Sequence, residues 1–197
     1  MSTLSSKALT STDASFASTG RKKSSLRSKV DELTGKLEHA ELLLDISKQM
    51  AACTTSDESL ETFLGIMVEQ TQAERGTLFL NDPQTGELYS RVSLGNFRRE
   101  IRIINTSGIA GYVFGTGECV NVPNAYADER FDPSIDEKTG FTTKGIICVP
   151  IQTIKNEIIG VAQVINKFDG DFSEDDLNLL SVMTHQAALA LKSMQRV

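Results

Sequence analysis

Cysteine, histidine and proline are scarce in this sequence of 197 residues, which contains only three, two and four of them. Cys53, Cys119 and Cys148 are odd in number and far apart, so they form neither a disulfide framework nor a Cys-x-x-Cys metal pair. His39 and His185 are too few to supply a histidine-based site. The sequence therefore predicts no catalytic residues, no metal site and no cofactor.

Long apolar runs are absent too. No stretch approaches the roughly 20 apolar residues that a transmembrane helix needs, and residues 1–19 lack the apolar core of a secretory signal. We therefore expect a cytoplasmic protein without a transmembrane segment. Residues 1–29 hold six basic residues and one acidic residue, whereas the rest holds 14 basic and 25 acidic residues. Because phosphate neutralisation needs clustered cations, this acidic body predicts no nucleic-acid partner.

The first part of the chain changes character at residue 26. Residues 1–25 contain twelve Ser and Thr residues and few large apolar ones, which predicts a disordered tail. Apolar residues then alternate at spacings of 4 and 3, as in a heptad repeat: Leu26, Val30, Leu33, Leu37, Ala40 and Leu44. This pattern predicts a coiled-coil-like helix over residues 26–54.

The rest of the chain shows the pattern of one α+β domain, which we place at residues 55–180. Capping boxes at residues 55–58 and 173–176 predict the starts of two helices. Strands are predicted at residues 76–80, 88–94, 101–104, 146–154 and 158–165, with a long connection over residues 105–145. This order predicts a central antiparallel sheet with helices on its faces.

The final helix carries a second heptad-like pattern from Leu180 to Val197. We assign residues 181–197 to the start of a C-terminal linker helix. The sequence stops inside this helix without a glycine cap or a following proline, so we expect it to be cut from a longer protein. Heptad patterns on both sides of the domain predict a homodimer through the flanking helices, in either parallel or antiparallel orientation.

Four stretches resemble the GAF domains of cyclic-nucleotide phosphodiesterases and cyanobacterial adenylyl cyclases. They are residues 108–118 (GIAGYVFGTGE), residues 121–128 (NVPNAYAD), the positions Asp136, Thr139-Gly140-Phe141 and Thr143, and the NKF signature over residues 166–176. The resemblance implies a GAF fold with a pocket for cAMP or cGMP. It implies ligand contacts by Thr77, Ile109, Ala110, Phe131, Asp132, Thr139, Thr143 and Gln163. The structural signature would comprise Asn166, Lys167, Phe168, Phe172 and Asp176, with an ion pair between Lys167 and Asp176.

The phosphate of such a ligand has no evident arginine partner in the long connection. Residues 105–145 carry six acidic residues against Arg130, Lys138 and Lys144. The phosphate would therefore rest on backbone N–H groups at residues 108–111, at the start of a helix. The alternative interpretation is that these glycines only make a turn into the helix.

Three functional hypotheses follow. In the first, the chain is a regulatory, non-catalytic sensor of cAMP or cGMP that relays binding through its flanking helices to an effector such as a nucleotide cyclase. In the second, it is a ligand-free GAF module for dimerisation or interaction. In the third, it is an enzyme of the methionine sulfoxide reductase type, which would require two or three thiols converging on the pocket.

Overall fold

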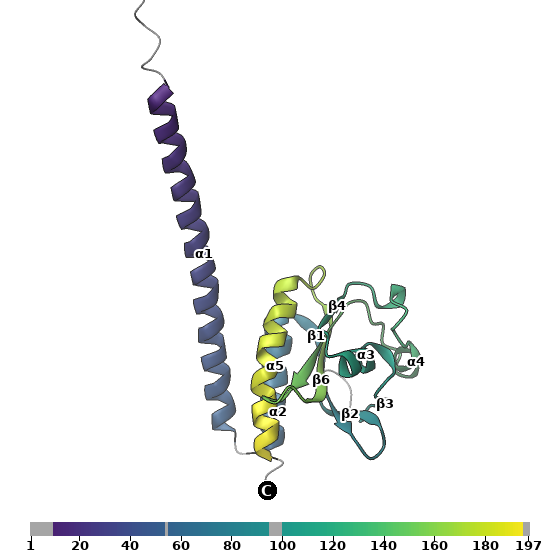
Figure 1. Ribbon diagram of the computed structural model, residues 1–197. Coiled ribbons are helices and arrows are strands. Elements are labelled where there is room, and N and C mark those ends of the chain that lie inside the picture. The colour runs from purple at the N-terminus through teal and green to yellow at the C-terminus, as the bar shows by residue number, and fades with distance from the viewer. Residues whose placement is uncertain (1–9, 54, 95–99, 195–197) are drawn as a thin grey trace, which may run out of the picture. The chain divides into compact units, whose positions relative to one another are not determined.

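The computed structural model describes residues 10–53, 55–94 and 100–194, and the chain divides into two compact units, residues 1–44 and 45–197. Helix α1 spans Thr10–Ala52 as one continuous helix (Figure 1). Residues 10–25 are thus helical, whereas their composition predicts disorder; residues 1–9 lie outside the described residues. No proline occurs before residue 83, so nothing interrupts the helical hydrogen bonds.

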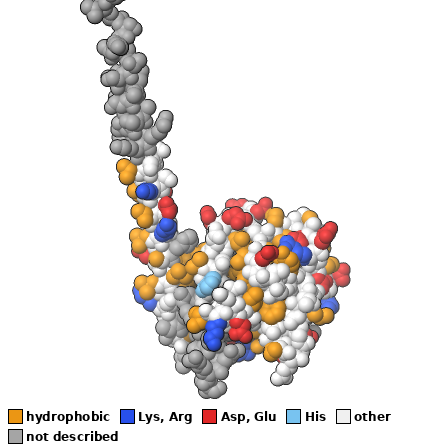
Figure 2. Space-filling model, in the orientation of Figure 1, with side chains coloured by type: hydrophobic (Ala, Val, Ile, Leu, Met, Phe, Trp, Pro, Cys, Tyr) orange, Lys and Arg blue, Asp and Glu red, His pale blue; other side chains and the backbone are white. Residues whose placement is uncertain are grey.

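The heptad pattern lies on an uncovered stripe of the first unit. Leu26, Val30, Leu33, Leu37 and Leu44 have exposed fractions between 57% and 63%. Hydrophobic side chains follow the described part of α1 (Figure 2). We call these five residues the α1 stripe. A helix with such a stripe gains stability when another apolar surface covers it.

The second unit is built on a six-stranded antiparallel sheet with the strand order β3-β2-β1-β6-β5-β4. The strands are β1 (Ala73–Asp82), β2 (Glu87–Leu94), β3 (Arg102–Ile104), β4 (Val120–Val122), β5 (Ile146–Gln152) and β6 (Ile158–Lys167). The helices are α2 (Ser56–Thr71), α3 (Gly108–Thr116), α4 (Ser134–Thr139) and α5 (Glu174–Met194), with a short 3-10 helix at Ala125–Ala127. The predicted α+β class with a central antiparallel sheet is confirmed.

One face of this sheet is covered by α2 and α5, which contact each other and the strands (Figure 1). Leu60, Phe63, Leu64 and Met67 recur at helical spacing on α2, and each is at most 1% exposed. Leu180 and Met183 of α5 are fully buried as well. The heptad-like pattern of the final helix thus begins with core residues; its last member, Val197, lies outside the described residues.

Capping hydrogen bonds are present at both predicted helix starts. Thr55 accepts a hydrogen bond from the Glu58 backbone N–H (3.2 Å) at the start of α2. At the start of α5, the Asp176 N–H donates to Ser173 Oγ (3.1 Å) and the Ser173 N–H donates to Asp176 Oδ2 (2.7 Å). These bonds satisfy amides that have no acceptor within the helix. They fix where the two helices of the packed face begin.

The opposite face of the sheet is covered by α3, α4 and the connections between them (Figure 1). Helix α3 contacts β5 and β6, and its residues Ile109 and Val113 share a buried cluster with Phe79 of β1. Side chains alternate along a strand, so Arg75, Thr77 and Phe79 of β1 point to this face. Here the long predicted connection contains three helical segments and a strand rather than irregular chain alone.

Among the described residues, no helix is long and apolar enough to span a bilayer. In the same part of the chain, no group of histidine, cysteine and carboxylate side chains is arranged to hold a metal ion.

Candidate functional site

The start of α3 presents backbone N–H groups without helical acceptors. Ser107 precedes the helix in an extended conformation and makes no capping bond with its side chain. The first amides of a helix have no acceptor four residues before them, so those of residues 108–110 point out of the helix end. No acidic residue lies in the first turn, and Ile109 and Ala110 are buried. This end of α3 has the polarity that an anion requires.

The two glycines of the first turn also have local structural reasons. Gly108 has a φ of +70°, which side chains other than glycine rarely adopt. A Cβ at Gly111 would lie 2.6 Å from the carbonyl carbon of Thr106, because the chain passes close to this position. These observations support the interpretation that the two glycines make the turn into the helix. That structural role is compatible with anion binding at the same amides.

A cavity of about 120 Å³ lies between this face of the sheet and its cover. Its floor is formed by strands, with Phe79, Ile146 and Ile165 among its apolar members. Its cover consists of the start of α3 and of residues between Phe131 and Thr143. All eight ligand contacts implied by the resemblance border it: Thr77, Ile109, Ala110, Phe131, Asp132, Thr139, Thr143 and Gln163. The structure thus brings together residues that are up to 86 positions apart in the sequence.

A polar row crosses the floor of the cavity on three neighbouring strands. Thr77 of β1 pairs with Ser93 of β2 on one side and with Gln163 of β6 on the other. The hydroxyl oxygens of Ser93 and Thr77 lie 3.5 Å apart. The row thus places two hydroxyl groups and one amide on an apolar floor. Such a surface can orient a flat ligand that carries polar groups at its edges. Ser93 was not expected at the site from the sequence. Its place beside Thr77 follows from the pairing register of β1 and β2.

The cover is held by a buried carboxylate. Asp136, 5% exposed, accepts hydrogen bonds from the Thr143 N–H (2.6 Å), the Thr143 hydroxyl (2.8 Å) and the Tyr126 hydroxyl (3.1 Å). Burial and this contact with Asp136 raise the pKa of Tyr126. Thr143 borders the cavity, yet its hydroxyl is used to hold Asp136. This side chain therefore shapes the cover in this structure.

The other predicted residues of the cover also bond to their neighbours. Thr139 is exposed, and its Oγ1 accepts from the Phe141 N–H (3.3 Å). The ring of Phe131 packs against Tyr126 with centroids 5.0 Å apart. Asp132 accepts from the Ser134 N–H (3.0 Å), which is the main cause of its lowered pKa, and lies 3.5 Å from the Ser107 hydroxyl. Asp132 thereby connects the cover to the start of α3.

The cation at the cavity comes from β1. Among the described residues that border the cavity, Arg75 is the one Lys or Arg. Its guanidinium lies 3.7 Å from the centroid of the Phe141 ring, so it stacks on the cover from the sheet. Arg130, considered in the sequence analysis, instead binds Asp128 through two bonds of 2.8 and 2.6 Å and lowers the pKa of that carboxyl.

The predicted structural signature joins the cover to α5. Asn166, with a φ of 58°, accepts from the Lys144 N–H (2.7 Å) and donates to the Thr142 carbonyl (3.0 Å). The next residue, Lys167, forms the expected ion pair with Asp176 (2.5 Å) at the start of α5. Phe172 is buried at 6% exposure, whereas Phe168 is 77% exposed. Phe168 is thus the one signature residue without a packed position.

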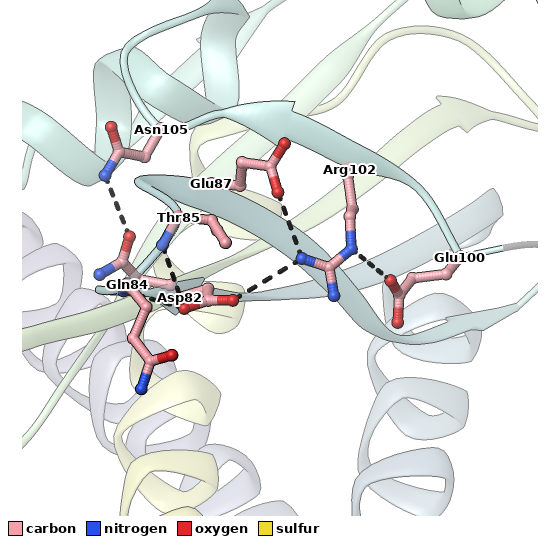
Figure 3. A network of polar contacts seen from close by, with 8 residues as sticks. Asp82, Gln84, Thr85, Glu87, Glu100, Arg102 and Asn105 are labelled. Atoms are coloured by element: carbon pink, nitrogen blue, oxygen red, sulfur yellow. Dashed lines mark hydrogen bonds and ion pairs between the residues drawn. The ribbon is translucent and has the colours of Figure 1, made fainter.

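The edge strand β3 is fixed by a group of ionic contacts around Arg102 (Figure 3). Its guanidinium reaches Glu100 at 2.5 Å, Glu87 at 3.2 Å and Asp82 at 3.7 Å. The neighbours of Arg102 on either side, Ile101 and Ile103, border the cavity. Arg102 therefore links the strand that carries this wall of the cavity to the last residue of β1 and the first residue of β2.

Among the described residues that border the cavity there is no cysteine. Cys148 is fully buried, and burial raises its pKa well above the ordinary value, so it stays protonated. Cys119 is exposed and Cys53 is half-buried. The reductase hypothesis requires two or three converging thiols, and the described lining of this cavity holds none.

The fold is that of an α+β domain with a cavity on one face of its sheet. Residues 56–191 match the GAF domain family, and the chain belongs to it. It is 37% identical over 162 residues to "Probable 3',5'-cyclic phosphodiesterase pde-5" of Caenorhabditis elegans, covering 76% of this chain and 22% of that protein. It is 36% identical over 172 residues to "Dual 3',5'-cyclic-AMP and -GMP phosphodiesterase 11" of Drosophila melanogaster, covering 79% and 12%. The chain thus spans about a fifth or less of the length of these relatives.

Solved structures agree on the fold. The GAF domain from an Acinetobacter phosphoenolpyruvate-protein phosphotransferase superposes with a TM-score of 0.70 at 20% identity, covering 80% of this chain and 95% of that one. The free methionine-R-sulfoxide reductase from Neisseria meningitidis gives 0.68 at 21% identity, covering 81% and 92%. The predicted GAF fold is confirmed. At these identities the likeness concerns the fold alone, because one fold serves several chemistries.

Proposed function

We propose that this chain is a regulatory GAF domain that binds a cyclic nucleotide, cAMP or cGMP, in the cavity under α3. The observation that carries the proposal is the convergence of all eight family-implied residues on one cavity. The names of the relatives with 36–37% identity, which are cyclic-nucleotide phosphodiesterases, support the same ligand class.

In this proposal the two ends of the ligand meet different chemistry. The cyclic phosphate lies against the backbone N–H groups that begin α3, at Ile109 and Ala110, where the helix dipole favours an anion. The purine lies over the floor, where Thr77 and Gln163 supply polar groups within apolar surroundings. Phe131, beside Asp132 in the cover, packs on the purine. Thr139 and Thr143 shape the rest of the cover.

Binding would be relayed by the flanking helices. Ligand in the cavity bonds to the cover, which Asn166 and Lys167 connect to α5. We propose that α5 and the α1 stripe transmit this change within a homodimer to an effector domain outside this sequence. The effector is a cyclase, as the resemblance suggests, or a phosphodiesterase, as the relatives suggest. The chain itself would act in the cytoplasm without catalysing a reaction.

Calorimetric titration of the purified chain with cAMP and with cGMP tests this function. Any carried-over ligand is first removed by unfolding and refolding. We expect saturable heat with one nucleotide, and loss of that heat in Thr77→Phe, which fills the floor of the cavity. Thr85→Phe, in the exposed turn between β1 and β2, is the matched control and should bind like the parent. Absence of heat from either nucleotide, in protein with a normal thermal transition, contradicts the proposal.

A second candidate is a ligand-free dimerisation module. The α1 stripe favours it, because five large apolar side chains stand more than half exposed on one unit. Sedimentation of the parent chain and of Leu33→Ser distinguishes the two functions. A dimer that binds no nucleotide and dissociates on this substitution would support the module, whereas nucleotide binding supports the sensor whatever the oligomeric state.

A further inference from the structure

The α1 stripe leaves five large apolar side chains more than half exposed on the first unit. We propose that a second copy of this chain covers the stripe in an antiparallel coiled coil, with residue 35 of each helix at the twofold axis. The inference rests on the homodimer of the proposed function. It goes beyond that homodimer because it fixes the direction and the register of the two helices, which the heptad pattern alone leaves open.

The apolar seam of α1 matches itself when it is read backwards. It comprises six exposed residues, which alternate between the d and a positions of a heptad in the order Leu26, Val30, Leu33, Leu37, Ala40 and Leu44. In the proposed pair, each a residue lies opposite a d residue of the partner. The six layers are Leu26 with the partner's Leu44, Val30 with the partner's Ala40 and Leu33 with the partner's Leu37, each occurring twice. A self-complementary surface of this kind fits a second copy related by twofold symmetry.

The packing of these layers favours the antiparallel direction. In a parallel pair in register, each seam residue would meet its own copy, so two alanines would share the layer at position 40. Such a layer leaves space between the helices and loses dispersion contacts. In the antiparallel pair, each Ala40 instead meets the partner's Val30, and the other four layers contain leucine alone.

The charges beside the seam favour the same direction. Arg27 and Glu41 occupy e positions, and both side chains are exposed. Antiparallel pairing brings the e positions of the two helices side by side, so that each Arg27 lies beside the partner's Glu41. Lys36, at a g position, meets its own copy near the axis. Its charge is offset within its own helix, because its ammonium group lies 2.5 Å from the Glu32 carboxylate.

A parallel pair would align the basic starts of the two stripes. Residues 21–29 contain five basic residues and no acidic one, and parallel copies would place these two segments along each other. Lys36 would then pair with the partner's Glu41, so this arrangement also gains an ion pair. In the antiparallel pair, residues 21–29 lie beside residues 41–49, which contain two acidic residues and one basic residue. Charges next to the seam set helix orientation in coiled coils, so the net balance favours the antiparallel pair.

Cysteine cross-linking of the full chain distinguishes the two directions. In the antiparallel pair, the two copies of residue 26 are 18 residues apart along the axis, or about 27 Å, whereas a disulfide needs Cα atoms within about 7 Å. The background is Cys53→Ser with Cys119→Ser, which removes the two thiols that are not buried. We expect no covalent dimer from Leu26→Cys alone or from Leu44→Cys alone, and a covalent dimer when these two variants are mixed and oxidised. Ser28→Cys, at an outward f position, is the control and should not cross-link to Leu44→Cys.

Charge reversal provides a second test, with the dimer dissociation constant measured by sedimentation. Arg27→Glu should raise this constant by about three-fold or more, because it replaces two ion pairs by two repulsive contacts. Glu41→Lys should act in the same direction, and the double variant should return to within about two-fold of the parent. Glu38→Lys, at an outward b position, is the matched control for the change of charge. A parallel pair predicts the opposite sign for Arg27→Glu, since that substitution relieves repulsion between the basic segments.

The outcomes separate this inference from nucleotide binding. A disulfide that joins two copies of Leu26→Cys overturns the antiparallel direction and leaves both the dimer and the sensor in place. A dimer that persists unchanged in Leu33→Ser is held by another surface, which overturns the inference. A folded chain that stays monomeric overturns it as well, while calorimetry decides independently whether the chain binds a nucleotide. An antiparallel dimer that binds neither cAMP nor cGMP supports the inference and removes the sensor.

Discussion

The two faces of the sheet are closed by different means. On one face, α2 and α5 bury side chains such as Phe63, Met67 and Leu180 at 0% exposure. On the other, a cover of short helices leaves a cavity of about 120 Å³, and polar contacts such as those of Asp136 hold the cover. Apolar packing closes the first face, whereas the second combines a buried apolar cluster around Ile109 and Val113 with a polar frame that leaves a cavity.

The largest effect is expected on the packed face. Phe63→Ala removes a fully buried ring from α2 and should lower the free energy of unfolding by about 3–5 kcal/mol, because the surrounding side chains cannot fill the space. Urea denaturation measures this change. Phe131→Ala, on the half-buried cover, serves as the comparison and should cost less stability but weaken nucleotide binding. Equal stability losses in the two variants would contradict the division between the faces.

The next effect concerns the ion pair that joins the faces. Lys167→Ala leaves Asp176, whose side chain is 12% exposed, without its cation and should cost about 1.5–3 kcal/mol. We also expect weaker nucleotide binding, because α5 and the cover lose a shared anchor. Lys155→Ala, in the exposed turn between β5 and β6, is the control. Nucleotide affinity equal to that of the parent would argue against the anchoring role.

The same pair gives a pH dependence. Burial raises the pKa of Asp176, but the bonds from Lys167 and Ser173 outweigh it, so the pKa is lowered overall. A carboxyl with a lowered pKa in the folded state contributes stability above its unfolded pKa of about 3.9, and this contribution is lost as pH falls below that value. Urea unfolding between pH 3 and pH 6 should therefore show a smaller acid loss in Lys167→Ala than in the parent. Identical pH profiles would show that the pair does not titrate with folding.

A smaller effect is expected where the cover is held. Asp136→Asn replaces one acceptor oxygen by a donor that faces the Thr143 or Tyr126 donors, at a cost of about 1–3 kcal/mol. The loss should be local, so hydrogen exchange should rise in residues 134–143 more than in α2. Asp169→Asn changes an exposed carboxylate after β6 and should leave the exchange unchanged. Uniform acceleration throughout the domain would contradict a local clamp.

The sequence predicted the packed face better than the cavity. Helix α2 was predicted because its apolar residues repeat at 3.6-residue spacing next to Thr55, which is local information. Within the cavity, the family motifs led to eight residues that border it. Arg75 and Ser93 also border it and were missed. The predicted first strand began at residue 76, whereas β1 begins at Ala73, so Arg75 was not placed on the sheet.

Ser93 was missed for a different reason. Its place in the cavity depends on pairing with Thr77, and a strand register is set by long-range contacts rather than by the neighbours of Ser93 in sequence. The long connection was similarly predicted without its elements. Helix α4 and strand β4 are 6 and 3 residues long, too short for a periodic pattern to show. Polar contacts such as those of Asp136 hold this region, and the spacing of hydrophobic residues in the sequence does not predict such contacts.

The smallest effect is expected for the polar row on the floor. Ser93→Ala removes a half-buried hydroxyl 3.5 Å from that of Thr77 and should change the free energy of unfolding by no more than about 0.5 kcal/mol. Nucleotide affinity should still fall by roughly two- to ten-fold, because a ligand-facing hydroxyl loses one hydrogen bond. Thr85→Ala, in the exposed turn, is the control for both measurements. A loss of stability without a loss of affinity would reverse the comparison, since Ser93 would then belong to the frame of the sheet rather than to the site.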